Sequence, residues 1–281
     1  MTRAEQITDP ITEHGEGPVW SSHWGKLRWV DMLAGDVLEL DDSCAVSRTH
    51  VGSVAAVIRP RLGGGAVVAL EDTFSVTDGP LTELRPLPRV ITDAGIRMNE
   101  GGCDPAGNFY CGSMAYDQSV GAGSFYRLGL DGSVQAVFTS VTISNGFSFS
   151  PDQSRAYYID THTHRVDVFD YAPSTLLSNR RPWVSIPTDV GGPDGLCVDA
   201  DGYVWVALFG GSAVHRYSPE GKLDGIIDLP VRQVTACAFG PDRLYITTSR
   251  IGLGDDAESE AGALFAADVG VAGLETLPYG A

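Results

Sequence analysis

One pattern recurs six times along the 281 residues of this chain. Each copy has a run rich in Val, Ile, Phe, Tyr or Trp, a turn containing Gly, Asp or Pro, a second such run, and a third run after a polar turn. The first two runs and their turn cover residues 17–31, 55–69, 101–113, 146–160, 191–207 and 236–248. A period of roughly 40 to 50 residues built from short β-rich runs is typical of β-propellers, whose repeats are four-stranded sheets.

We therefore predict an all-β fold, a six-bladed β-propeller with four-stranded antiparallel blades. A sheet with an uncovered apolar face is not stable alone, so the six sheets must pack against one another in a ring. Residues 1–13 are expected to add the outer strand of the last blade and so close the ring. Because no linker or change of composition interrupts the repeats, we expect residues 1–281 to form a single domain.

The fifth copy shows the repeat most clearly. Its runs at 196–198 and 203–206 flank the turn 199–202, which ends in Asp-Gly. Glycine adopts positive φ without steric cost, so this segment predicts a tight hairpin. Asp194 precedes the first run in the segment 191–195, which we interpret as a loop. A carboxylate there can face a ligand, and the alternative is that Asp194 only stabilises a turn.

Charge and cysteine content exclude several classes of function. A net charge of −17 disfavours nucleic acids and anionic membranes as partners, because both require basic patches. The five cysteines are odd in number and show no CxxC spacing, which indicates reduced thiols. The N-terminal residues include no apolar signal segment, and no apolar run is long enough to span a bilayer. We expect a cytoplasmic protein that is a monomer or a weak homo-oligomer.

Polar residues stand at matched positions in four of the six copies. They are Glu16, Asn99, Asn145 and Asp194, each at the entry to the first run of its copy. Matched positions in a propeller lie around one mouth of the central channel, so these side chains are expected to converge. Carboxylate and amide oxygens suit Ca²⁺, Mg²⁺ or Mn²⁺, with Zn²⁺ less typical. We predict one divalent cation at this mouth, although each residue taken singly could be an ordinary turn residue.

Several short motifs together resemble one protein family over nearly the whole chain. They are EGPVW at 16–20, RMNE at 97–100, DPAG at 104–107, GSM at 112–114, SNG at 144–146, PDG at 193–195 and DADGYVWV at 199–206. This set resembles the regucalcin–gluconolactonase family of six-bladed propeller lactonases. The resemblance implies a divalent cation held by Glu16, Asn145 and Asp194, with Asp194 also acting as general base. It further implies that Arg97 and Asn99 hold a sugar lactone.

Two positions depart from the family pattern. The loop 115–123 is shorter than in the family and lacks its acidic substrate contact, so we expect Tyr116 or Asp117 to take that place. Glu100 stands where aspartate is common. We include Glu100 and Tyr116 among the expected substrate-binding residues, and the identity of the sugar lactone stays open.

The leading hypothesis is a metal-dependent hydrolase that opens a sugar-acid lactone. The alternatives are a phosphotriesterase or arylesterase of the same fold and a non-catalytic calcium-binding regulatory propeller. No Gly-x-Ser-x-Gly motif is present, which disfavours a serine esterase. His162 and His164, beside Asp160, are expected to alternate along a strand and to have a structural or surface role.

Overall fold

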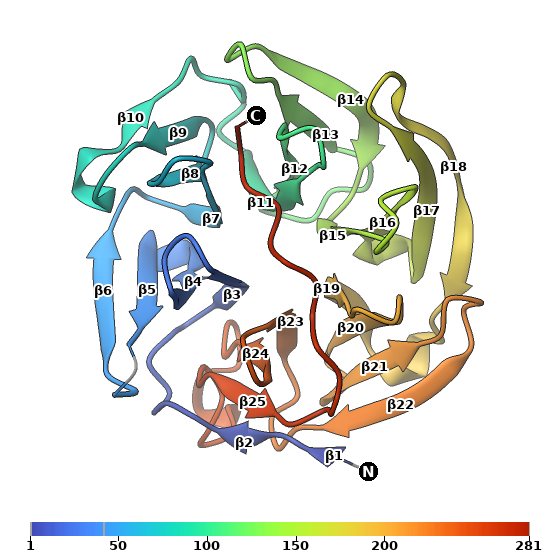
Figure 1. Cartoon of the computed structure of the whole chain (residues 1–281). Helices are drawn as coiled ribbons and strands as arrows, with labels where there is room; N and C mark the ends of the chain where they lie inside the picture. Colours follow the sequence, from blue (N-terminus) through green and yellow to red (C-terminus); the bar gives the residue numbers. More distant parts are fainter. Residues whose placement is uncertain (1, 42, 281) are drawn as a thin grey trace.

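The computed structural model describes residues 2–41 and 43–280, and its sheets surround a central axis like the blades of a propeller (Figure 1). Within these residues there are six sheets, five with four strands and one with five. Apart from two short strands at the N-terminus, successive strands of a blade pair antiparallel and follow one another in chain order from the axis outward. The predicted all-β, six-bladed propeller is therefore confirmed.

Blades one to three are formed by the first half of the chain. Blade one contains β3 (Gly15–Ser21), β4 (Lys26–Asp31), β5 (Asp36–Leu40) and β6 (Val46–His50). Blade two contains β7 (Ala55–Pro60), β8 (Ala66–Leu70), β9 (Phe74–Thr77) and β10 (Arg85–Pro86). Blade three contains β11 (Ile96–Cys103), β12 (Phe109–Ala115), β13 (Gly123–Leu128) and β14 (Val134–Val141).

Blades four to six follow in the same way. Blade four contains β15 (Ser144–Phe149), β16 (Arg155–Asp160), β17 (Arg165–Ala172) and β18 (Leu176–Ser185). Blade five contains β19 (Gly192–Val198), β20 (Val204–Phe209), β21 (Ala213–Tyr217) and β22 (Leu223–Asp228). Blade six contains β23 (Val234–Phe239), β24 (Leu244–Thr248) and β25 (Phe265–Ala267), and it takes its fourth strand from the N-terminus.

Helical structure in the described chain is limited to short 3-10 turns. They are η1 (Met32–Ala34), η2 (Leu81–Glu83), η3 (Thr161–Thr163), η4 (Thr188–Val190) and η5 (Gly254–Asp256). None of these turns approaches the length or apolar character that a membrane-crossing helix requires.

The N-terminal residues close the ring, as the repeats predicted. Strand β2 (Glu5–Gln6) pairs antiparallel with β25 and so completes blade six. The preceding β1 (Thr2–Arg3) pairs parallel with β22 of blade five, which the sequence did not indicate. The N-terminal segment therefore joins two neighbouring blades through backbone hydrogen bonds.

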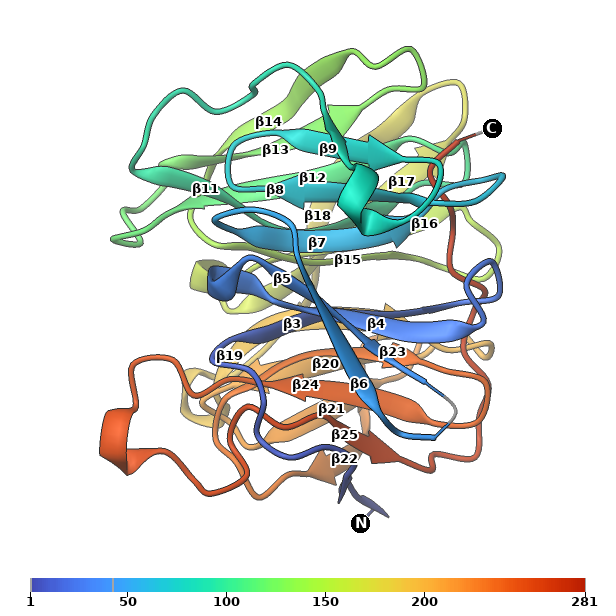
Figure 2. The same cartoon turned by 90° about the vertical axis from the view of Figure 1, so that its left-hand side faces the viewer.

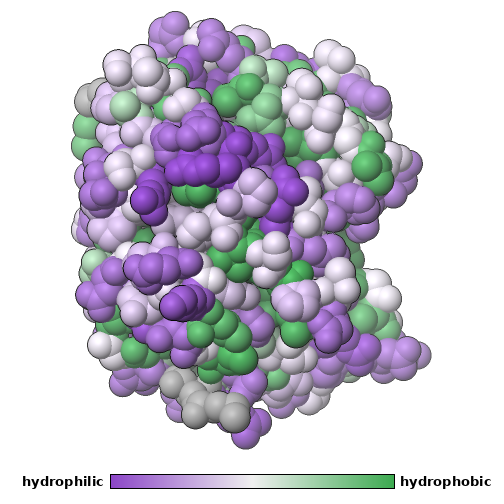
Figure 3. Space-filling view, turned by 90° about the vertical axis from the view of Figure 1, so that its right-hand side faces the viewer, coloured by the Kyte–Doolittle hydropathy of each residue, from purple (hydrophilic) through white to green (hydrophobic). Residues whose placement is uncertain are grey.

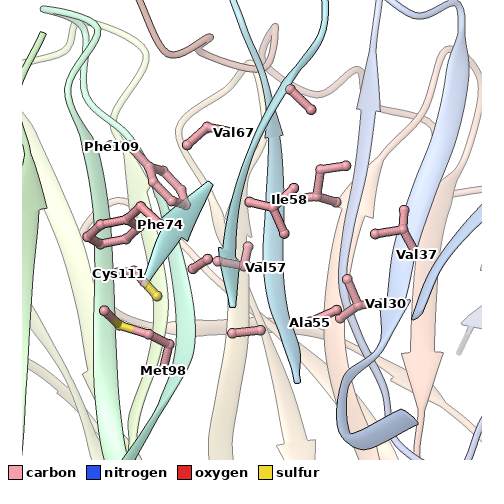
Figure 4. Close-up of a cluster of buried hydrophobic side chains, with 14 of the residues drawn as sticks. Val30, Val37, Ala55, Val57, Ile58, Val67, Phe74, Met98, Phe109 and Cys111 are labelled. Carbon is pink, nitrogen blue, oxygen red and sulfur yellow. The ribbon is translucent and has the colours of Figure 1, made fainter. Parts of the chain in front are cut away.

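Apolar side chains fill the spaces between neighbouring blades. Figure 4 shows one such cluster, in which Val57 and Ile58 of β7 lie among residues of blades one and three. Phe74 and Phe109 meet there edge to face, with ring centroids 5.5 Å apart. Such close-packed interiors resist deformation, so the inner strands form a rigid frame around the axis.

Two local predictions were wrong. Asp194 lies inside β19, whereas the sequence indicated a loop at 191–195; a β-bulge accommodates the Asp-Gly pair within the strand. The hairpin of β19 and β20 is nevertheless present as predicted. His162 belongs to η3 and His164 adopts a left-handed conformation at φ 48°, so the two histidines do not alternate along a strand.

The C-terminal residues cross one mouth of the ring. The segment 268–280 runs over the axis in Figure 1 and along one edge of the molecule in Figure 2. It is held by a bridge between Gly273 and Asp199, by a bridge between Tyr279 and Arg61, and by a 2.7 Å hydrogen bond from Thr276 Oγ1 to the Trp20 carbonyl. This covered mouth lies opposite the mouth where the matched polar residues gather.

The outer surface mixes polar and apolar residues. On the side that carries β18 and β22, purple and green residues are interspersed (Figure 3). The large apolar side chains that are exposed come from separate segments: Leu62, Tyr116, Val120, Leu130, Val137 and Leu223. Single exposed apolar side chains of this kind are ordinary on a protein surface in water.

Candidate active site

The inner strand of every blade carries a β-bulge at the same level of the ring. The register shifts lie between Glu16 and Val19, Ala55 and Val57, Met98 and Gly101, Ser144 and Phe147, Pro193 and Leu196, and Val234 and Ala236. A bulge adds one residue and redirects a side chain from the sheet face. The residues at this level are Glu16, Ala56, Asn99, Asn145, Asp194 and Thr235. The six bulges thus place one ring of side chains, four of them the predicted site residues, around the channel.

Five of the predicted site residues line one cavity of about 300 Å³ at the uncovered mouth. Glu16, Arg97, Asn99, Asn145 and Asp194 all contribute to its wall. Their matched positions in the sequence repeats predicted this convergence, although the first and last of them are 178 positions apart, at residues 16 and 194. The cavity is large enough for a ligand the size of a single sugar ring, at the lower end of the range of small-molecule pockets.

Two buried carboxylates face this cavity with few protein donors. Glu16 Oε2 accepts a hydrogen bond from the backbone N–H of Gly17 at 3.0 Å. Among the described residues, no donor lies within hydrogen-bond distance of the Asp194 carboxylate, although its residue is only 5% exposed. Burial, followed by repulsion from Glu100, raises the pKa of Glu16 to about 8. Burial and repulsion from Glu16 likewise raise the pKa of Asp194 well above its usual range.

A chain of hydrogen bonds orients the two asparagines. Arg97 Nη1 donates to Asn99 Oδ1 at 2.6 Å, and Asn99 Nδ2 donates to Asn145 Oδ1 at 2.9 Å. Asn145 Nδ2 then donates to Thr161 Oγ1 at 2.7 Å, and that hydroxyl donates to the Pro193 carbonyl at 2.7 Å. Because the Thr161 proton is committed to Pro193, Thr161 must accept from Asn145. The network therefore fixes the amide of Asn145, and Oδ1 keeps a second lone pair.

Asn99 has less freedom to bind a substrate than the sequence suggested. Both protons of its side-chain amide are engaged, one with the Ser144 carbonyl at 2.7 Å and one with Asn145. Its Oδ1 already accepts from Arg97. Asn99 can offer one further acceptor position, and its main structural effect is to couple Arg97 to Asn145.

Arg97 lies in the wall of the cavity with part of its guanidinium committed. Nη1 donates to Asn99 and to the Met98 carbonyl at 3.0 Å, and it lies 3.0 Å from Met32 Sδ. The guanidinium carbon lies 5.7 Å from the centre of the Tyr116 ring. Burial lowers the pKa of Arg97, but a guanidinium keeps its charge in proteins. Arg97 therefore brings the positive charge nearest to the two carboxylates, with donors left for a ligand.

Two further aspartates hold the segments that lead into the site. Asp31 Oδ1 accepts from the backbone N–H of His14 at 3.0 Å. Asp160 accepts from the backbone N–H groups of Thr142 and Ile143, both at 3.0 Å. These contacts fix the chain immediately before Glu16 and Asn145. Neither role was predicted from the sequence: Asp31 was not singled out, and Asp160 was considered only beside His162 and His164.

Glu100 and Tyr116 lie outside the cavity wall that the other predicted residues share. Glu100 lines a second cavity, of about 120 Å³, on the side covered by the C-terminal segment. Burial raises its pKa to about 7, and its Oε2 has no hydrogen-bond partner in the described chain. Tyr116 is 45% exposed and donates its hydroxyl proton to Glu71 Oε1 at 2.6 Å.

Three polar residues of the cavity wall were not singled out from the sequence: His14, Gln118 and Thr161. His14 could have been found from its place two residues before Glu16; its Nδ1 lies 2.8 Å from Ser249 Oγ, and burial lowers its pKa to about 3. Gln118 reaches the cavity from the loop where Tyr116 or Asp117 was expected. It does so with a left-handed φ of 58°, which residue type alone does not reveal.

The residues present fit a divalent cation. Glu16 and Asp194 supply carboxylate oxygens that have few or no protein donors, and Asn145 Oδ1 supplies a neutral oxygen held in place by its amide contacts. Buried carboxylates that lack partners are costly, and a cation would offset their charge. The described chain contains no group of three His, Cys, Asp or Glu side chains arranged to hold a metal ion. The fit therefore depends on Asn145 as the third ligand, together with solvent or substrate.

Comparison with known proteins relates this geometry to a family. The family described as "SMP-30/Gluconolactonase/LRE-like region" matches residues 14–250. Regucalcin from Danio rerio is 34% identical over 289 residues, covering 99% of this chain and 98% of the relative. Pentonolactonase XacC from Haloferax volcanii is 34% identical over 284 residues, covering 95% of each chain.

Solved structures give the same assignment. A structure described as the calcium-binding protein regucalcin from Agrobacterium tumefaciens superposes with a TM-score of 0.92 at 28% identity, covering 100% of this chain and 98% of the other. The family match runs from the residues just before the first inner strand into the sixth blade. It therefore includes all six residues of the ring at the β-bulges, from Glu16 to Thr235. The chain belongs to the SMP-30/gluconolactonase/LRE-like family, as the motif resemblance indicated.

Proposed function

We propose that this protein is a divalent-cation-dependent lactonase that opens a sugar lactone to the corresponding sugar acid. The observation that carries the proposal is the pair of buried carboxylates, Glu16 and Asp194, which face one cavity beside Arg97 without a full set of protein donors. A relative named pentonolactonase supports the opening of a lactone, and a similar structure described as a calcium-binding protein supports the cation.

Glu16, Asn145 and Asp194 would hold the cation. When bound, the cation supplies a Lewis acid that polarises the lactone carbonyl and offsets the negative charge that develops on its oxygen. Arg97 would orient the lactone, because its planar fork of donors suits neighbouring oxygens. Asn99 would hold Arg97 in that orientation through the 2.6 Å hydrogen bond.

Asp194 would also accept the proton of the attacking water. Its burial and its repulsion from Glu16 both favour proton uptake. A bound cation would lower this pKa again and keep the carboxylate ionised near neutral pH, which is the form that a general base requires. The bulge in β19 holds the side chain in the cavity, so that proton transfer needs no movement of the backbone.

The wall of the cavity favours sugar lactones over less polar esters. Arg97, Asn99, Thr161 and Gln118 offer polar groups, whereas Met114, Ile143, Phe209 and Ile251 contribute apolar surface. A phosphotriester or aryl ester offers the Arg97 donors fewer oxygens than a hydroxylated lactone does, which disfavours such substrates. A calcium-binding protein without catalysis would keep the carboxylates but would have no use for the Arg97 fork.

A lactone panel tests the proposal. Five- and six-membered aldonolactones, a phosphotriester and an aryl ester would be followed with a pH indicator or a chromogenic leaving group. Each would be measured after chelation and again with Ca²⁺, Mg²⁺, Mn²⁺ or Zn²⁺. We expect turnover of at least one sugar lactone that chelation abolishes and a cation restores. Cation binding with no lactone turnover would instead establish the non-catalytic alternative.

A further inference from the structure

The cavity on the covered side of the channel is lined by three cysteines. Cys103, Cys197 and Cys237 share its wall with Arg59 and Glu100, beneath the C-terminal segment. Its volume is about 120 Å³, which is enough for a few molecules the size of water. This space has no part in the proposed lactonase chemistry, although it lies in the same channel.

Two of these cysteines are in contact across a blade junction. Cys197 lies on β19 of blade five, and Cys237 lies on β23, the inner strand of blade six. Their sulfur atoms are 3.6 Å apart, although the residues are 40 positions apart in sequence. Cys197 is partly exposed, whereas Cys237 is buried. Both side chains face the cavity, so a small solute there would meet the two sulfurs together.

We propose that Cys197 and Cys237 form an oxidisable dithiol, which hydrogen peroxide entering this cavity converts into a disulfide between blades five and six. A disulfide joins its sulfurs at about 2.0 Å, so they must approach by about 1.6 Å. Rotation of the two side chains about their Cα–Cβ bonds moves the sulfur atoms without displacing the rigid inner strands.

The chemistry balances with one peroxide for each pair. One thiol loses its proton, and its sulfur attacks a peroxide oxygen; the O–O bond breaks, a water leaves and a sulfenic acid remains. The second sulfur attacks the sulfenic sulfur, an S–S bond forms and a second water leaves. The two sulfurs lose two electrons and the peroxide gains them. One dithiol and one hydrogen peroxide thus give one disulfide and two waters.

The surroundings make this a slow and selective reaction. Burial and the contact with Cys237 raise the pKa of Cys197 well above its usual range, so little thiolate is present at neutral pH. Cys44 is exposed, and it is not one of the three cysteines that share the cavity. Cys44 is therefore expected to react first, but without forming an internal disulfide.

The test uses the full-length chain with Cys44 replaced by serine, which removes the exposed thiol. The protein is treated with hydrogen peroxide, denatured, alkylated, and analysed by intact mass and peptide mapping. We expect a loss of two hydrogen atoms, two fewer alkylated cysteines, a Cys197–Cys237 cross-linked peptide, and full reversal by a reducing agent. The Cys44→Ser chain keeps four of the five cysteines. Recovery of all four in alkylated form after peroxide treatment would overturn the proposal.

Two matched variants fix the assignment. Cys197→Ala and Cys237→Ala, each in the Cys44→Ser background, should form no internal disulfide under the same treatment. An internal disulfide that still forms in either variant would show that another thiol is responsible. So would a disulfide to Cys103 in the protein that keeps both Cys197 and Cys237. Oxidation of Cys197 or Cys237 to sulfinic acid without a cross-link would also contradict the proposal. The result for the parent chain stands even if an alanine variant fails to fold.

Discussion

Asp194 and Asp199 lie five residues apart on the same hairpin, and both are buried, yet their surroundings are opposite. Asp199 accepts hydrogen bonds from the backbone N–H of Tyr203 at 2.8 Å, from Trp205 Nε1 at 3.0 Å and from Arg216 Nη2 at 2.9 Å. Asp194 has no donor within hydrogen-bond distance among the described residues. One carboxylate is satisfied by the fold, and the other is left for a ligand.

This contrast separates structural from functional acids. A buried carboxylate that is hydrogen-bonded and paired with a cationic side chain stabilises the folded chain. A buried carboxylate without such partners destabilises the cation-free chain and gains from a bound cation. By this criterion Asp199 maintains blade five, whereas Glu16 and Asp194 have the charge and burial expected of cation ligands. The following substitutions test that distinction.

The largest effect is expected for Asp194→Asn. The substitution keeps an oxygen ligand and nearly the same shape but removes most of the basicity. With the cation at saturating concentration, kcat for the lactone should fall by about 10² to 10⁴, the usual range for a lost general base. Steady-state kinetics at several cation concentrations measure this. Glu16→Gln is the matched control, since it loses one ligand charge without a proposed proton transfer, and it should recover most of its rate at high cation.

If saturating cation restores kcat equally in Asp194→Asn and Glu16→Gln, Asp194 is only a ligand. The acid limb of the kcat/KM profile gives a second readout, because it should be present in the wild type and absent from Asp194→Asn.

Asp199→Asn should have the next largest effect, and on stability rather than chemistry. The change leaves Arg216 without its buried anion and places an amide N–H₂ near donors such as Trp205 Nε1, so unfolding should become easier by about 3 kcal/mol. Chemical denaturation of the cation-free chain measures this. Asp194→Asn should cost nothing or should stabilise, because it removes repulsion from Glu16. A larger loss for Asp194→Asn than for Asp199→Asn would reverse the comparison.

Arg97→Ala should have a moderate effect that is confined to the substrate. Removing a charged hydrogen-bond donor to a ligand costs about 1.5–3 kcal/mol, so kcat/KM should fall about 10- to 100-fold. Cation affinity should not fall, since Arg97 cannot ligate a cation and its own charge repels one. Arg97→Lys is the matched control and should rescue only partly, because lysine lacks the planar fork. Weaker cation binding in Arg97→Ala would contradict this role.

The most gradual effect is a pH dependence of the cation-free chain. The pKa of Glu16 is about 8 when folded, against 4.5 as its ordinary value, so between these pH values the folded chain holds a proton that the unfolded chain has released. This contribution to stability is complete below about pH 4.5 and is lost as the pH rises through 8. The Tm should therefore decline over this interval more steeply in the wild type than in Glu16→Gln. Parallel Tm curves for the two proteins would exclude Glu16 as the cause.

Much of the fold followed from local sequence signals. The Asp-Gly turn at 199–202 and the alternating runs beside it specify a hairpin through short-range chemistry, and six copies of that unit leave a ring as the way to cover every sheet. The convergence of Glu16, Asn145 and Asp194 followed from the same repeat. These predictions depended on spacing, which sequence displays directly.

Other features depended on contacts that sequence does not display. The bulge that keeps Asp194 inside β19 depends on pairing with β20. The sequence does not display that pairing, so it predicted a loop at 191–195. The direction of Glu100 depends on its position beside Asn99 in the bulge of β11, and it faces the second cavity. Gln118, rather than Tyr116 or Asp117, reaches the site because of its left-handed backbone.

The central claim is that Glu16, which has one backbone donor, and Asp194, which has none among the described residues, together hold one cation. Calorimetric titration tests this claim most directly. Chelated protein would be titrated with Ca²⁺, Mg²⁺, Mn²⁺ and Zn²⁺ at pH 7 in two buffers of different ionisation enthalpy. The account predicts one cation per chain and release of protons on binding, because carboxylates with raised pKa must ionise to ligate. Binding should weaken sharply in Glu16→Gln and Asp194→Asn and persist in Arg97→Ala. Absence of binding, or equal binding in Glu16→Gln, Asp194→Asn and the wild type, would contradict the account.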